Sequence, residues 1–216
     1  MMPEQTARTA VSSVLSQSKA VSCVRAALTD ARDALEALIA DQGMLQVIAR
    51  AAALIAQSQR AGGAVYSCGN GGSLCDAMHF AEEMTGRYRM DRRAYRAAAI
   101  SDVSHMACVG NDYGYGHVFS RWVAGMGRPG DVLLAITTSG TSGNIIEAAR
   151  EARARGMKVI ALTGRAGSPV TEAADLSIVT PAGRWADRVQ ELHIKVIHIL
   201  IELVERELDP QNYETK

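Results

Sequence analysis

The chain has 216 residues, of which 48% are hydrophobic and 21% are charged, as is usual for a globular domain. Lysine plus arginine and aspartate plus glutamate each number 23, so the formal net charge is zero. This balance removes the bulk electrostatic argument for nucleic acid or an anionic membrane, and we expect neither as a partner. No apolar run reaches the length of a membrane span and no signal-peptide pattern is present, so we expect a cytoplasmic protein.

The four cysteines argue against a disulfide framework or a cysteine zinc knuckle, because no two of them have C-x-x-C spacing. Free thiols in a reducing compartment fit better. These residues are Cys23, Cys68, Cys75 and Cys108.

Residues 1–20 are polar and predict an N-terminal arm or an irregular start to a helix. Residues 21–59 carry apolar side chains at helical spacing and predict two helices, separated by Asp41-Gln42-Gly43. We expect residues 21–216 to form one domain that includes this helical extension. The two helices either cover their own sheet or pack on another subunit, and the sequence does not favour one alternative.

The stretch from Ala64 to Glu83 reads AVYSCGNGGSLCDAMHFAEE and predicts a buried strand, a glycine-rich loop and a helix from Leu74 onward. Free N–H groups and the helix dipole at such a junction favour a phosphate. His79 and Glu83 lie one helical turn apart on the same face. A plain strand-to-helix connection is the alternative, because the loop has neither a dinucleotide nor a P-loop fingerprint. The pair behind the loop favours chemistry on a phosphorylated substrate.

Beyond this stretch, strands and helices alternate, and two loops are rich in polar residues and glycine. The loop GNDYGYG spans 110–116, and the loop TTSGTS spans 137–142. The other elements that we expect are strands over 97–100, 132–136, 158–162 and 176–179, and helices over 102–108, 117–125, 144–155, 169–174 and 185–208.

The alternation predicts an α/β fold with a five-stranded parallel sheet flanked by helices, with the flavodoxin-like strand order 2-1-3-4-5. In that order the switch point lies between the first and third strands, and ligands bind there beyond the carboxyl ends. The loops over 69–73 and 137–142 follow these two strands. We therefore expect one binding site between the two loops.

The loop over 137–142 supplies five hydroxyl groups ahead of a helix, which is more than a single helix cap requires. Such a group of hydroxyl and N–H donors suits a phosphate. The last helix carries Gln190, His193 and His198, and a histidine on an apolar face is often a buried core residue. Helical spacing alone does not choose between His193 and His198 as a functional residue.

The chain resembles the sugar-isomerase (SIS) domain family, and within it the phosphoheptose isomerases, through several motifs that follow one another along the sequence. The resemblance runs from about Ser67 to Leu208 and rests on CGNGGS, DAMHFAEE, ISDVSH, VGNDYGYG, TTSGTS and ADRVQELHIKVIHIL. It implies a five-stranded α/β fold assembled as a homotetramer, with active sites near subunit contacts. It also implies conversion of the ketose sedoheptulose 7-phosphate to the aldose D-glycero-D-manno-heptose 7-phosphate through an enediol, for lipopolysaccharide or capsule synthesis.

The same resemblance implies roles for individual residues. Glu83 and His198 would be the acid/base pair, and one zinc ion per subunit would be bound by His79, Glu83, Gln190 and His198. Two departures leave the needed groups in place: Leu74 stands where some relatives carry His, and Thr137 where many carry Ser. Substrate contacts are implied for Asn70, Gly71, Gly72, Glu83, Asn111, Asp112, Thr137, Thr138, Ser139, Ser142 and Gln190, of which the four hydroxyl residues would hold the phosphate.

Two other functions compete with the isomerase. A non-catalytic SIS protein, either a sugar-phosphate sensor or an adaptor like the relative that binds the replication initiator DnaA, needs the two loops but no acid/base pair. Glu83 and His198 are both present, which favours the enzyme. A flavodoxin-like nucleotide binder is less favoured, because the sequence has no nucleotide fingerprint.

Overall fold

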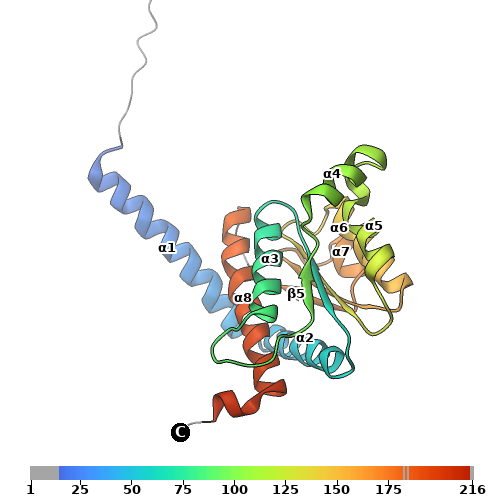
Figure 1. Ribbon diagram of the computed structural model, residues 1–216. Coiled ribbons are helices and arrows are strands. Elements are labelled where there is room, and N and C mark those ends of the chain that lie inside the picture. Colours follow the sequence, from blue (N-terminus) through green and yellow to red (C-terminus); the bar gives the residue numbers. More distant parts are fainter. Residues whose placement is uncertain (1–14, 182, 184, 215–216) are drawn as a thin grey trace, which may run out of the picture.

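The sheet has five parallel strands in the order β2-β1-β3-β4-β5, which confirms the predicted fold class and strand order. The structure is a computed structural model that describes residues 15–181, 183 and 185–214 (Figure 1). The central strands read as apolar runs because both faces of the sheet are covered. The strands are β1 (Val65–Cys68), β2 (Ala97–Ala99), β3 (Val132–Thr137), β4 (Lys158–Thr163) and β5 (Leu176–Val179).

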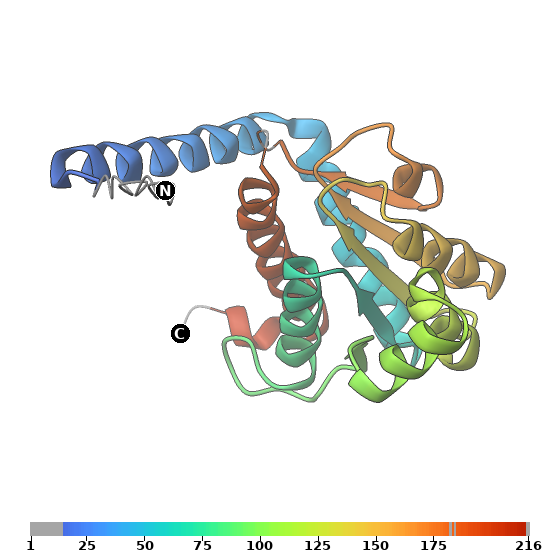
Figure 2. The ribbon, with the colours of Figure 1, turned by 90° about the horizontal axis from the view of Figure 1, so that it is seen from above.

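Helices cover the sheet in two layers, one on each face (Figure 2). The first layer holds α2 (Gln42–Arg60), α3 (Gly72–Thr85) and α8 (Ala186–Leu208). The second layer holds α4 (Val103–Asp112), α5 (Val118–Met126), α6 (Gly143–Ala154) and α7 (Pro169–Glu172), with the short helix η1 (Tyr115–His117) between α4 and α5. Side chains of β3 alternate between the layers, with Leu134 in the first core and Leu133 in the second.

The two N-terminal helices have different environments, and only for α2 does the structure decide the alternative that the sequence left open. Helix α2 buries Ile48 and Ile55 against its own sheet. Helix α1 (Gln17–Ala40) buries only Leu38 and extends away from the body (Figure 1). It begins inside the arm expected over 1–20, and residues 1–14 lie outside the described residues. Among the described helices none alone is long and apolar enough to cross a membrane, although α1 and α2 together, bent by 80°, pass the same test.

The predicted boundary between helix and loop near residue 108 is wrong. Helix α4 continues to Asp112, so the first part of the expected loop over 110–116 is helical. The reason is that Tyr113 N–H still donates to Val109 O at 2.9 Å, and the left-handed φ of +85° falls at Gly114 rather than at Gly110. Both Asn111 and Asp112 are therefore in the last turn of a helix.

Candidate active site

The loop after β1 is shaped by glycines that no other residue can replace without strain. Gly71 caps α3 with a φ of +55°, a left-handed conformation that side chains disfavour. A Cβ on Gly72 would lie 2.5 Å from Nε2 of Gln190, so the Gln190 amide rests directly on the start of α3. The first N–H groups of a helix have no acceptor within the helix. The loop therefore offers donors, and α8 contributes an amide beside them.

Asn70 in this loop is held by two partners from other parts of the chain. Its Nδ2 donates to Oδ1 of Asn144 at 2.9 Å, and Nδ2 of Asn144 donates back to its Oδ1 at 2.8 Å. The Tyr115 hydroxyl also donates to Oδ1 of Asn70, at 3.2 Å. Asn144 is the second residue of α6, and Tyr115 lies in η1. The β1 loop is thus joined to the segments that follow α4 and β3.

The hydroxyl-rich loop after β3 lies at the start of α6. Thr137 Oγ1 and Ser142 Oγ are 3.3 Å apart, and Ser142 is the N-cap residue of α6 without capping the helix through its side chain. Ser139 is exposed and accepts from Thr141 N–H at 3.3 Å and from the Thr141 hydroxyl at 3.0 Å. Hydroxyl donors therefore stand beside free helix N–H groups, as an anion site requires.

His79, Glu83 and His198 meet where α3 packs beside α8 (Figures 1 and 2). Their ligand atoms all lie within 4.8 Å of one another. The Nε2 atoms of the two histidines are 2.8 Å apart, and Nε2 of His79 is 3.7 Å from a Glu83 carboxylate oxygen. Nδ1 of His79 lies 3.1 Å from the Glu82 carboxylate, which orients the ring. Two imidazole nitrogens and one carboxylate oxygen form a donor set that can bind a metal ion.

The charges in this cluster follow from its half-buried position. Burial raises the pKa of Glu83, and the Glu82 carboxylate raises it further. Burial and the neighbouring His79 lower the pKa of His198. A carboxylate with a raised pKa is a stronger base, and a histidine with a lowered pKa is neutral at pH 7. The pair is therefore suited to moving protons.

The two histidines of α8, between which helical spacing does not choose, have different surroundings. His198 is in the cluster, whereas His193 is fully buried. Neither ring nitrogen of His193 has a well-formed hydrogen bond among the described residues, and burial lowers its pKa to about 4. His193 is thus a neutral core residue.

The final turns of α3 are fixed by one buried arginine. Arg92 donates to the backbone oxygens of Glu83 at 2.7 Å and of Met84 at 2.9 Å. Its Nε donates to Glu205 of α8 at 2.8 Å, and both side chains are fully buried. The backbone that carries Glu83 is therefore anchored to the helix that carries His198.

Comparisons with known proteins show which family the chain resembles in sequence and fold. Residues 28–164 match the SIS domain family. A phosphoheptose isomerase of Yersinia pestis (strain Pestoides F) is 59% identical over 185 residues, which cover 86% of this chain and 96% of the relative. The structure of a phosphoheptose isomerase from Francisella tularensis is similar with a TM-score of 0.82 at 32% identity, covering 87% of this chain and 98% of that one. The corresponding structure from Neisseria gonorrhoeae gives 0.75 at 38% identity, covering 88% and 98%.

The chain belongs to the phosphoheptose isomerase family of SIS-domain proteins. The 59% sequence identity to the Yersinia pestis relative, over most of both chains, supports this assignment. The strand order of the sheet and the structural similarity to the Francisella tularensis protein agree with it. The family resemblance inferred from the sequence motifs is confirmed.

The remaining candidate residues lie at the end of α4, after β3 and on α8. Asn111 and Asp112 are exposed at the end of α4, where Nδ2 of Asn111 donates to Asp112 at 2.7 Å. Thr138 follows β3 and accepts the Gly164 N–H through its carbonyl at 3.2 Å. The contact that positions Gln190 is with Gly72, at the loop end of α3.

Three residues that contact candidate site residues were not predicted from the sequence: Asp76, Arg92 and Asn144. Oδ2 of Asp76 is buried without a hydrogen-bond partner among the described residues, and burial raises its pKa to about 6 while His79 opposes this rise. Its position three residues before His79 on α3 was a usable signal. The sequence carries no comparable signal for Arg92 and Asn144, because both act through contacts distant in the chain.

Proposed function

We propose that this protein interconverts sedoheptulose 7-phosphate and D-glycero-D-manno-heptose 7-phosphate, an aldose–ketose isomerisation that proceeds through an enediol. The observation that carries the proposal is the cluster of His79, Glu83 and His198, which forms between α8 and the helix that follows the β1 loop. The reaction moves a proton between C1 and C2 and a second proton between two oxygens. It needs a base that faces carbon and an acid/base group that faces oxygen.

Glu83 is the group we assign to carbon, and His198 the group we assign to oxygen. The raised pKa of Glu83 makes its carboxylate a better base for a C–H proton. The lowered pKa of His198 leaves its ring neutral, so it can accept a proton from one oxygen and return it to the other. Arg92 holds the Glu83 backbone in place during this exchange.

We assign a zinc ion, one per subunit, to His79, Glu83, Gln190 and His198. Two imidazole nitrogens and a carboxylate oxygen within 4.8 Å of one another support the first, second and fourth of these. When bound, such a cation supplies stabilisation of the negative charge on an enediolate oxygen. Gln190 has weaker support, because its amide rests on Gly72.

The substrate is assigned to the two loops and the end of α4. The sugar is held by Asn70, by the loop N–H groups of Gly71 and Gly72, and by Gln190 beside them. The phosphate is held by the loop after β3, where hydroxyls and the α6 N-terminus meet. The complete set of substrate residues that we propose is Asn70, Gly71, Gly72, Glu83, Asn111, Asp112, Thr137, Thr138, Ser139, Ser142 and Gln190.

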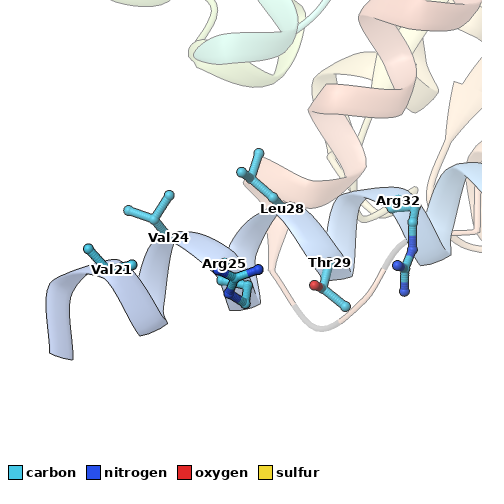
Figure 3. Close-up of a pocket in the computed structure, with 6 residues that line it drawn as sticks. All are labelled: Val21, Val24, Arg25, Leu28, Thr29 and Arg32. Atoms are coloured by element: carbon cyan, nitrogen blue, oxygen red, sulfur yellow. The ribbon is translucent and has the colours of Figure 1, made fainter. Parts of the chain in front are cut away.

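We also propose that the chain assembles as a homotetramer through its N-terminal helices, as one SIS domain over 21–216 that includes this extension. Helix α1 exposes Val21, Val24 and Leu28, and each is more than half exposed. The pocket drawn in Figure 3 is lined by α1 alone, and no other element of the described part of the chain lines it. An apolar face of this kind is typical of a subunit contact.

We propose that the product serves as a heptose precursor for lipopolysaccharide or capsule synthesis. We place the reaction in the cytoplasm. All four cysteines are free thiols, and three of them are exposed. Free exposed thiols persist in a reducing compartment.

Incubation of the purified protein with sedoheptulose 7-phosphate, followed by NMR, tests the proposal. The protein is first treated with a chelator and assayed with and without added zinc. Turnover that zinc restores supports the isomerase and a functional metal. Binding of the sugar phosphate without turnover, with the protein folded, would replace the isomerase by a sugar-phosphate sensor, and absence of both would favour an adaptor.

A further inference from the structure

Asn70 and Asn144 form a closed pair of amides that links the two loops of the site. Each Nδ2 donates to the Oδ1 of the other, at 2.9 and 2.8 Å. Asn70 belongs to the loop after β1, and Asn144 opens α6 directly after the hydroxyl-rich loop. Asn144 is buried, with 5% of its surface exposed.

The hydrogen-bonding capacity of Asn70 is almost used up by these contacts. An amide oxygen accepts two hydrogen bonds, and an amide nitrogen donates two. Oδ1 of Asn70 accepts from Asn144 and from the Tyr115 hydroxyl, so both of its acceptor sites are filled. One N–H of Nδ2 is committed to Asn144. One N–H of the Asn70 amide therefore remains free to donate to a ligand.

We propose that Asn144 is a positioning residue for the substrate: it fixes the Asn70 amide so that this donor faces a sugar oxygen, and it couples the sugar loop to the phosphate loop. This inference rests on the proposed function, since it needs a sugar phosphate that spans both loops. Asn144 stays buried and acts through Asn70. The resulting site recognises an oxygen that accepts a hydrogen bond near Asn70 and rejects a group that can only donate.

A double-mutant cycle separates this role from a general effect on folding. The kcat and KM for sedoheptulose 7-phosphate are measured for the unmodified protein, Asn70→Ala, Asn144→Ala and the double variant. We expect Asn144→Ala to lower kcat/KM about tenfold or more, as loss of a positioned hydrogen bond does. In the Asn70→Ala background the same change should lower it less than twofold, because the donor it positions is already absent.

Two further variants keep the result interpretable. Tyr115→Phe removes one hydroxyl from an exposed side chain, so it tests the same amide without threatening the fold, and we expect a smaller loss of kcat/KM that also vanishes in Asn70→Ala. Asn212→Ala, in the C-terminal helix η2 (Pro210–Tyr213), is the matched control and should leave both constants unchanged.

Equal losses from Asn144→Ala in both backgrounds, or no loss in either, would overturn the positioning role. Turnover by the unmodified protein tests the proposed function separately. If that protein binds the sugar phosphate without turning it over, the same cycle is measured on the dissociation constant, with the same coupling expected.

Discussion

The Nε2 atoms of His79 and His198 lie 2.8 Å apart, although the two residues come from different helices. At that distance one ring donates and the other accepts, so both rings cannot be protonated at these atoms without repulsion. The neighbouring His79 accordingly lowers the pKa of His198, second to the effect of burial. Two imidazole nitrogens and a carboxylate oxygen of Glu83 this close together form a donor set that suits a cation.

The first prediction concerns the relative importance of the proposed zinc ligands. We expect His79→Ala to weaken zinc binding about a hundredfold or more, because it removes one of the clustered nitrogens. Gln190→Ala should weaken it much less, since Gln190 rests on Gly72. Competition with a chromophoric chelator measures both affinities. Equal losses in the two variants would show that the amide is a full ligand, and Gln211→Ala serves as the control for Gln190→Ala.

The second prediction concerns the phosphate loop. Ser139→Ala removes an exposed hydroxyl that the proposed phosphate would use, so we expect KM to rise about tenfold with little change in kcat. Steady-state kinetics over a range of substrate concentrations separates the two constants. Ser18→Ala in α1 is the matched control. An unchanged KM would argue against a phosphate contact at Ser139.

The third prediction concerns the buried ion pair between Arg92 and Glu205. Arg92→Met leaves the Glu205 carboxylate buried without its partner, so we expect the free energy of unfolding to fall by about 3–5 kcal/mol. The double variant with Glu205→Leu should recover only part of this loss, because no charge then stays buried but the backbone oxygens of Glu83 and Met84 still lack their donor. Denaturant titration measures each value. Arg150→Met, in an exposed pair, should change it by about 0.5 kcal/mol or less.

The fourth prediction concerns stability in acid. Burial lowers the pKa of His193 to about 4, below its ordinary value of 6.5. Unfolding therefore takes up a proton in the window between these values, and stability is lost as the pH falls from 6.5 towards 4, by about 3 kcal/mol in total.

Denaturant titration of the metal-free protein at pH 7 and pH 5 measures this loss. We expect His193→Gln to lose about 2 kcal/mol less than the unmodified protein over that interval, while His117→Gln, at an exposed position, loses as much as the unmodified protein. Identical losses in all three proteins would show that His193 does not titrate on unfolding.

The fold could be predicted from local signals. Short apolar runs, which predict strands, alternate with segments whose apolar residues have helical spacing, and loops rich in glycine or hydroxyl residues follow the strands. The end of α4 could not be predicted, because either Gly110 or Gly114 could end a helix. Only the backbone hydrogen bond from Tyr113 N–H to Val109 O shows that the helix continues past Gly110. A glycine thus marks a possible helix end without fixing it.

The site itself was predictable only in part. The pair His79 and Glu83 follows from helical spacing, but the choice of His198 over His193 depends on how α8 packs against α3. The amide of Asn144 meets Asn70 across 74 residues of chain, so no local pattern could indicate it.

The central claim is that Glu83 moves the proton between carbon atoms, and its most direct test is the isomerisation of sedoheptulose 7-phosphate in D₂O, followed by NMR. The unmodified protein with zinc should form the aldose and introduce deuterium at the carbon that Glu83 protonates. Glu83→Gln should lose both turnover and deuterium incorporation by about a hundredfold or more, while Glu151→Gln, in an exposed pair, keeps both. A folded Glu83→Gln protein that turns over at a near-normal rate would contradict the account.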